Sequence, residues 1–510
     1  MKGTQFSTAM IKKFTAAFSI YLLAGLVAVS ARSPQVHYTV SMEKPASHVF
    51  NVTMKYEGVN EPYTDLKMAV WTPGYYWLVD YSQNVSNLSV KDEKGEPLSW
   101  EKISKNIWHV NTQGMKSLIL TYDVYADNHS VAEPFLDDTH SYIAPAGLFI
   151  YPAGELKNPS EVTFKITAPW KTISTGLKVV SGKTSTYRAD NFDQLFDCPV
   201  LIGNQDVISF DVESVPHHIA SLLPEALDKE RVTSTYKSVV EAAAGIFGEM
   251  PYEDYTFIIM GPGGGGLEHT SSMAVFTGFR GSSILPQQRE KLQEWMSFIA
   301  HEYFHLYNVK TIRPVALGPF DYDRENYTNM LWVSEGFTVY YENIILNRAG
   351  LMNREEMLNS LKNTILAYES VPGHKVMSAT QSSFDQWIHS YMRGPDAINT
   401  SISYYDKGCA LGLLLDLKIR NETGNNKSLD DVMRYLYNKF YKDLGRGFTD
   451  NEFREVCEKF AGCDLSEIFG YASTTVDVDY SKYFSYAGLT IEDKYKEYPG
   501  SYTGIRSHQS

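Results

Sequence analysis

The stretch His301-Glu302-Tyr303-Phe304-His305 has the residue types and spacing of a hydrolytic zinc site. Residues 286–300, which precede it, carry apolar side chains at helical spacing, so we predict a helix over residues 287–310 that carries the motif. On a helix, residues i and i+4 share a face, so His301 and His305 would bind one metal ion while Glu302 stands beside an open coordination position. The alternative is a buried helix that merely bears two histidines, and a third ligand is needed to decide between them.

A third ligand is available downstream. Residues 331–342 are predicted as a second helix, and Glu335 within it would supply a carboxylate oxygen. Two histidines and one glutamate around a single Zn2+ ion form a hydrolytic set, because the metal lowers the pKa of bound water. Glu302 would then take the proton of that water and pass it to the leaving amine.

A glycine-rich run, residues 261–266, follows an apolar segment, Tyr255–Met260, that is predicted as a strand. Gly265 and Gly266 would let the backbone lie close to a substrate at the edge of a sheet. A phosphate cradle is disfavoured, because no Lys-Ser/Thr pair follows the run and Glu268 would repel phosphate. Glu268 suits an amine instead, and the alternative is a flexible glycine loop with an incidental acid.

Residues 403–408 open an apolar helical segment, residues 409–419. Tyr404 or Tyr405 would place a hydroxyl at the start of this helix, where it could donate to a developing oxyanion. Core packing is the alternative for both side chains, because the chain contains 35 tyrosines.

Together these segments resemble the glycyl aminopeptidase family of zinc metallopeptidases, within the thermolysin-like gluzincins. The similarity continues past the pentapeptide through residues 301–310, 312–314, 318–322, 325–328 and 332–338. It also includes the Gly-Gly-x-Glu-His segment at 265–269 and a Trp-x-Pro-Gly-x-Tyr signature at 71–76. The connection between His305 and Glu335 is longer than in the larger zinc aminopeptidases, but such a length is usual in the family resembled.

The resemblance implies a role for each candidate. His301, His305 and Glu335 would hold one Zn2+ ion, with Glu302 as the general base. The implied ligand is a peptide with a free amino terminus. Glu342 or Asp321 could orient the imidazoles.

For the substrate, the resemblance implies that Glu268, on the loop with Gly265 and Gly266, binds the amino terminus. Residues 405–408, Tyr-Asp-Lys-Gly, are similar to the Tyr-Glu-Lys-Gly of the larger aminopeptidases, which assigns oxyanion stabilisation to Tyr405 over Tyr404.

The implied activity is a zinc-dependent aminopeptidase that removes small amino-terminal residues such as Gly or Ala. A zinc endopeptidase is the alternative within enzymes, and it would need a cleft that is open beyond Glu268. A non-catalytic peptide-binding protein that retains the zinc scaffold is the alternative from another class, but structural zinc has no need of a base such as Glu302.

Residues 1–31 have the pattern of a secretory signal peptide, with Lys12 and Lys13 ahead of an apolar run. The alternative is an uncleaved anchor helix. We therefore expect export to the periplasm or the extracellular space, without stable membrane insertion once the signal is removed.

The remaining pattern predicts a multidomain α+β protein. Short alternating runs over residues 32–215 indicate an antiparallel β domain, and longer helical segments over 216–480 indicate a mostly helical, thermolysin-like catalytic domain. One helix is expected to begin after a capping box at residues 449–452 and to end at Gly462. Residues 481–510 form a tail that resembles the start of a PDZ domain that is truncated or absent.

The net charge is −14, and removal of the signal region, with three lysines and no acids, gives −14 − 3 = −17. There is no basic cluster, so we do not expect nucleic acid as a partner. Four cysteines in an exported chain allow disulfides, and a local bridge between Cys457 and Cys463 is the pairing we expect, with free buried thiols as the alternative. The aromatic side chains of Trp295, Phe298, Trp332 and Phe337 are expected to pack in the core.

Overall fold

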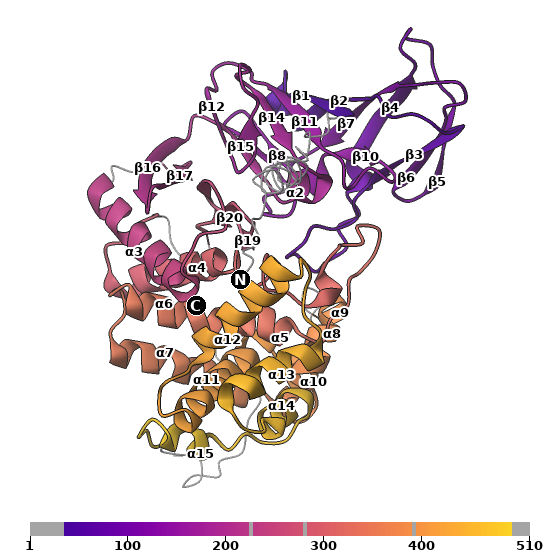
Figure 1. The fold of residues 1–510 in the computed structure, drawn as a ribbon. Coiled ribbons are helices and arrows are strands. Elements are labelled where there is room, and N and C mark those ends of the chain that lie inside the picture. Colours follow the sequence, from indigo (N-terminus) through magenta and orange to yellow (C-terminus); the bar gives the residue numbers. More distant parts are fainter. Residues whose placement is uncertain (1–34, 224–227, 279–282, 390–393, 492–510) are drawn as a thin grey trace, which may run out of the picture.

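The computed structural model of the protein describes residues 35–223, 228–278, 283–389 and 394–491. Strands dominate the first part of the chain and helices the second (Figure 1). This confirms the expected α+β architecture. The proposed signal peptide and residues 492–510 of the expected tail lie outside the described residues.

The β-rich part contains three sheets. The largest has the strand order β13-β14-β11-β1-β2-β7-β4, and the two others have the orders β10-β3-β6-β5 and β12-β15-β9-β8. The strand bounds are β1 Val36–Ser41, β2 Val49–Tyr56, β3 Tyr63–Met68, β4 Val85–Lys91, β5 Trp100–Ser104, β6 Ile107–Asn111, β7 Leu118–Tyr125, β8 Phe135–Leu136, β9 Ser141–Ile143, β10 Ile150–Pro152, β11 Ser160–Lys165, β12 Thr172–Thr175, β13 Lys178–Val179, β14 Thr186–Ala189 and β15 Val200–Gly203.

Within these sheets the pairing is antiparallel except between β1 and β11. Strand β2 alternates buried and exposed positions along its length, as expected for a strand with one face on a core. A short helix, α2 Phe192–Phe196, follows β14, and Asn191 caps its first turn.

The second part is built on a five-stranded sheet in the order β16-β17-β18-β20-β19. Its strands are β16 Asp206–Val212, β17 Val215–Ser221, β18 Tyr255–Met260, β19 Gly266–Glu268 and β20 Ser272–Phe276. The boundary that we expected after residue 215 would fall inside the β16–β17 hairpin. Because β17 pairs with β18, this hairpin belongs to the second part, which therefore begins at Asp206.

Helices cover this sheet and form the rest of the second part (Figure 1). Their bounds are α3 Lys229–Phe247, α4 Arg289–Phe304, α5 Leu331–Ser334, α6 Gly336–Arg348, α7 Arg354–Glu369, α8 Ala379–Phe384, α9 Gln386–His389, α10 Ala397–Thr400, α11 Tyr404–Glu422, α12 Leu429–Leu436, α13 Asp450–Ala461, α14 Ser466–Ser473 and α15 Tyr480–Ser485. Helix α13 has the predicted capping box between Thr449 and Glu452 and ends at Gly462, whose φ of +69° suits glycine. Nowhere in the described part of the chain is a helix both long enough and apolar enough to span a bilayer.

The expected disulfide is absent, because Cys457, Cys463, Cys198 and Cys409 are all free. Cys457 lies buried on the core face of α13, whereas the left-handed turn at Gly462 carries Cys463 towards Lys418 and Glu422 of α11. The two thiols therefore lie against different parts of the protein.

Candidate active site

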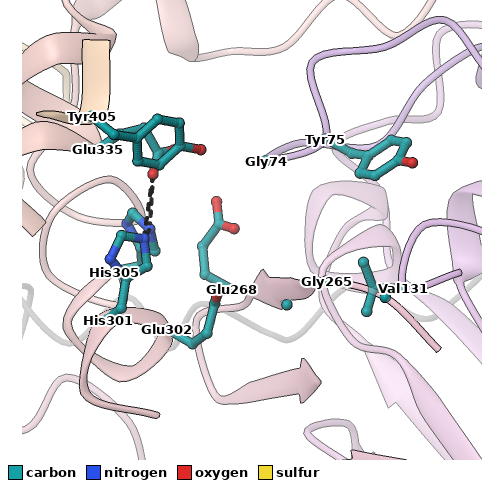
Figure 2. A pocket seen from close by; sticks show the side chains of 12 residues that line it. Gly74, Tyr75, Val131, Gly265, Glu268, His301, Glu302, His305, Glu335 and Tyr405 are labelled. Carbon is teal, nitrogen blue, oxygen red and sulfur yellow. Dashed lines mark hydrogen bonds and ion pairs between the residues drawn. The ribbon is translucent and has the colours of Figure 1, made fainter. Parts of the chain in front are cut away.

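Helix α4 and the break between α5 and α6 bring three potential metal ligands together. The Nε2 atoms of His301 and His305 lie 3.1 Å apart, and Oε2 of Glu335 lies 3.6 Å and 3.1 Å from them. Figure 2 shows both imidazoles directed at this carboxylate. The sequence predicted that His301 and His305 share a helix face and proposed Glu335 as their third partner, and the structure brings the three residues together.

The outer nitrogen of each imidazole is already engaged. Nδ1 of His301 lies 2.9 Å from Oε2 of Glu342, and Nδ1 of His305 lies 2.8 Å from the carbonyl oxygen of Asn308. With the Nδ1 protons donated outwards, the two Nε2 atoms and the Glu335 oxygen are three acceptors that face one another. Such an arrangement is repulsive unless a cation lies among them, so the donor set fits a tetrahedral metal ion with one position left open.

The electrostatics of this cluster also favour positive charge. Burial lowers the pKa of His301, but hydrogen bonds to Glu335 and Glu342 outweigh it and raise that pKa to about 10. Burial raises the pKa of Glu335, but the two histidines outweigh it and lower that pKa to about 2. The site therefore stabilises either protons or a metal ion between its ligands.

Of the two acids considered for orienting the imidazoles, Glu342 makes the contact. Its other oxygen accepts a hydrogen bond from Ser297 at 2.9 Å, which fixes the carboxylate. Asp321 lies elsewhere: its carboxylate pairs with Arg324 at 2.7 Å. The helix that we predicted through residue 310 ends at Phe304, and the irregular turn after it supplies the Asn308 carbonyl to His305.

Two glycines set the position of Glu335. A β-carbon added at Gly336 would overlap Cα of Gly408 in α11, and one added at Gly408 would overlap the carbonyl oxygen of Trp332. Helices α5–α6 and α11 therefore touch through their backbones at this point. The contact holds Glu335 in a fixed relation to the start of α11.

Tyr405 lies at that start and lines the pocket, with its ring stacked 6.2 Å from the ring of His301. Tyr404 stacks behind it at 4.7 Å and is buried in the core. Tyr405 thus lies beside the potential metal ligands (Figure 2), whereas Tyr404 is not among the residues that line the pocket.

Glu302 lies beside the ligand cluster and is only 5 % exposed. Burial, with Glu268 and Glu335 nearby, raises the pKa of its carboxyl to about 7 despite the opposing effect of the histidines. A β-carbon added at Gly266 would overlap Oε1 of Glu302, so only glycine lets strand β19 pass this close to the carboxylate. A carboxylate with such a pKa can both accept and release a proton near neutral pH.

Glu268 at the end of β19 is 4 % exposed, and its Oε1 atom has no hydrogen-bond partner among the described residues. A buried carboxylate oxygen of this kind calls for a cationic donor from a ligand. In Figure 2 its carboxylate projects into the space between the metal ligands and the β domain.

The β domain closes this side of the pocket. Gly74 has a φ of +92°, and a β-carbon added there would lie 2.6 Å from Oε1 of Glu268. Trp71 anchors the same loop, because its Nε1 donates to the carbonyl oxygen of Asp321 at 2.8 Å. The sequence marked residues 71–76 as a signature of the β domain, but did not indicate that this loop reaches the site.

A single pocket with a cavity volume of about 340 Å³ joins these features. It is lined by Gly74, Tyr75, Val131, Gly264, Gly265, Gly266, Glu268, His301, Glu302, His305, Glu335 and Tyr405. Three carboxylates and no lysine or arginine are among these lining residues, so the pocket favours a cationic group of a ligand.

Asp197 links the β domain to the segments behind the pocket. Its carboxylate accepts hydrogen bonds from the backbone nitrogen of Thr270 at 2.8 Å and from Nζ of Lys310 at 2.8 Å, and lies 3.3 Å from Nδ1 of His269. Burial alone would raise the pKa of Asp197, but Lys310 and His269 hold it well below its usual range. One side chain thus ties the residues after Glu268 to the turn after α4.

Comparison with known families agrees with this geometry. The Peptidase M61 N-terminal domain model matches residues 37–204, and the M61 glycyl aminopeptidase model matches residues 294–411. The chain belongs to the M61 glycyl aminopeptidase family. It is therefore a peptide hydrolase. No curated protein has a sequence that matches this M61 peptidase significantly.

Solved structures share the architecture. An aminopeptidase N family protein from Idiomarina loihiensis is 28 % identical, with a TM-score of 0.83 over 88 % of this M61 peptidase and 78 % of that chain. Aminopeptidase A from Legionella pneumophila, solved with aspartic acid, is 14 % identical, with a TM-score of 0.54 over 87 % of this chain and 50 % of that one. An M1 zinc metallopeptidase mutant from Deinococcus radiodurans, bound to a Tyr-Ser-Ala substrate, is 12 % identical, with a TM-score of 0.51 over 88 % and 95 % of the two chains. The last two similarities concern the fold alone.

Proposed function

We propose that this M61 peptidase is a zinc-dependent aminopeptidase that removes small amino-terminal residues from peptides. The observation that carries the proposal is the buried oxygen of Glu268, which has no hydrogen-bond partner among the residues that the structure describes and lies in the same pocket as the three proposed metal ligands. A free ammonium group supplies the cation that this oxygen lacks. A substrate without a free amino terminus would leave the carboxylate buried and unpaired.

His301, His305 and Glu335 would hold the zinc ion. A bound zinc ion supplies Lewis acidity towards the scissile carbonyl and lowers the pKa of water. Glu342 and the Asn308 carbonyl keep the imidazole Nε2 atoms directed inwards, so the ligands are oriented before the metal binds.

Glu302 is the proton carrier of the proposed mechanism. Buried beside the three proposed ligands, it would take a proton from the attacking water and release it to the leaving amine. Tyr405 would donate its hydroxyl proton as a hydrogen bond to the oxyanion that develops at the carbonyl. The backbone at Gly266 keeps Glu302 within the pocket without a side chain in between.

The loop at Gly74 supports an exopeptidase over an endopeptidase. It lies against the Glu268 carboxylate, where an endopeptidase would need an open groove for residues ahead of the cleaved bond. The same confined space supports a preference for Gly or Ala at the amino terminus. Residues 1–31 support export to the periplasm or the extracellular space.

The proposal is tested by metal analysis of the purified protein together with hydrolysis of aminoacyl reporter substrates, with and without a chelator. We expect one zinc ion per chain, cleavage of glycyl and alanyl reporters, loss of activity on chelation and recovery with zinc. An active protein that is free of metal, or equal rates on acetylated and free substrates, would contradict the proposal.

A further inference from the structure

Strand β19 presents two edges, and one of them is fully used by the sheet. Gly266 pairs with Val275 and Glu268 with Met273 of β20. The two backbone segments stay close together beyond the strands, because a β-carbon added at Gly278 would lie 2.6 Å from the backbone of Gly263 in the glycine run. Strand β19 is the outer strand of the sheet, and residues 264–266 and Glu268 line the pocket beside its other edge.

The β domain occupies that second edge at one place. Ser130 forms a parallel β-bridge with Gly264, and Val131 lies beside the next residue, since a β-carbon added at Gly265 would lie 3.6 Å from Cγ2 of Val131. Among the described residues, the stretch from Gly265 to Glu268 of this edge is left for a peptide. The edge is thus closed at its glycine end.

The segment that closes the edge is fixed to the β domain. The carbonyl oxygen of Val131 accepts a hydrogen bond from the Tyr142 hydroxyl at 2.7 Å, and that of Ala132 accepts one from the Tyr81 hydroxyl at 2.7 Å. The side chain of Ser130 also hydrogen-bonds to that of Tyr75. Val131 is only 2 % exposed, so the segment is part of a packed core.

The site sets the direction in which a substrate must run. Its amine is held by Glu268 at one end of β19, and its scissile bond must lie by Glu302, which Gly266 touches. The chain after the scissile bond then continues from Gly266 towards Gly264, antiparallel to β19. At a rise of about 3.3 Å per residue, this path holds about two or three residues before it meets Ser130 and Val131.

We propose that the substrates are di- and tripeptides, because the Ser130–Val131 segment of the β domain blocks the strand edge beyond the second residue after the cleaved bond. This inference rests on the proposed aminopeptidase function and adds the length of its substrates. The β domain then acts as a specificity element for chain length.

The test is a series of alanine peptides of two, three, four and six residues, all with an amidated carboxyl end so that charge does not vary with length. Hydrolysis by the full-length, metal-loaded protein is followed by release of free alanine. We expect kcat/KM to fall at least about tenfold between three and four residues. Values within about threefold through six residues would overturn the length limit while leaving the aminopeptidase function intact. If no peptide is cleaved, both proposals fail.

Variants at the block give an independent test. Val131→Ala should raise kcat/KM for the four-residue peptide relative to the two-residue peptide by about threefold or more, and Val131→Phe should lower the same ratio. Val40→Ala is the matched control, because Val40 is a fully buried valine of β1 in the same domain and is not among the pocket-lining residues. The assignment of the length limit to the Ser130–Val131 segment would be overturned by one result. In that result both Val131 variants melt at the same temperature as Val40→Ala, and neither changes the ratio of kcat/KM between the two peptides.

Discussion

The substitution Glu268→Gln should separate substrates by the state of their amino terminus. The change keeps the shape of the side chain and removes its charge. In the wild-type protein Oε1 of Glu268 is buried and has no hydrogen-bond partner within the described part of the chain, so folding has already removed the hydration of this carboxylate. A substrate ammonium group therefore has to lose only its own hydration when it binds.

The size of the effect follows from this geometry. Two unit charges about 3 Å apart at an effective dielectric of about 20 attract by about 5 kcal/mol. Desolvation of the ammonium group offsets part of this energy and leaves about 2–4 kcal/mol. The expected loss in kcat/KM for peptides with a free amino terminus is about 30- to 1,000-fold.

The assay compares alanyl reporter substrates with a free and with an acetylated amino terminus, each with wild-type protein and variant. The loss should be confined to the substrate with a free amino terminus. The ratio of its rate to the rate on the acetylated substrate should therefore fall strongly in the variant. Glu253→Gln is the matched control, since that side chain is 78 % exposed. A variant that keeps wild-type selectivity, or loses both substrates equally, would refute the role of Glu268.

Four further outcomes follow from the structure. Glu302→Gln should lower kcat by about 10²- to 10⁴-fold with the zinc content unchanged, since the proton carrier is lost and the ligands are kept. A chelator should lower the melting temperature as well as the activity, and zinc at about 100 times its Kd should restore about 2.7 kcal/mol of stability. Gly408→Ala should lower the free energy of unfolding by about 1–3 kcal/mol, measured by denaturant titration, because its methyl group overlaps the Trp332 carbonyl. Asp197→Asn should lower it by about 3 kcal/mol by leaving Lys310 buried and unpaired. Folding lowers the pKa of Asp197, so the extra free energy of unfolding of the wild-type protein over Asp197→Asn is complete above about pH 4. It is lost as the pH falls further, which acid titrations of both proteins would show.

Local patterns were enough to predict part of the candidate site. The i, i+4 spacing on α4 fixes His301 and His305 on one face whatever surrounds them, because the helix period does so. Glu335 needed one more step, the assumption that two helices meet, and the sequence signal for that contact was present in Gly336 and Gly408. A glycine inside a predicted helix marks a place where another backbone can approach, and these two mark the same place from both sides.

Long-range contacts could not be predicted in this way. Nothing local to Asp197 indicates that its partners are Thr270 and Lys310, since the pairing depends on how the β domain docks. The domain boundary was misplaced for the same reason: the β16–β17 hairpin alternates like the preceding strands, and only its pairing with β18 shows which sheet it joins. The end of α4 at Phe304 was missed because the residues that follow carry no glycine or proline to mark the turn.

The two ends of the pocket explain why the β domain is joined to the catalytic part. The residues that would perform the chemistry, Glu302 and the metal ligands, all come from the second part of the chain, and strand β19 alone would offer them an edge open in both directions. The β domain closes that edge twice, with Gly74 against Glu268 and with Ser130 against Gly264. An open edge accepts any extended chain, whereas an edge closed at both ends accepts only a short one whose terminus meets a buried carboxylate. The selectivity of the enzyme would then lie in the docking of the two parts, so a substitution at their contact should change which peptides are cleaved before it changes whether any peptide is cleaved.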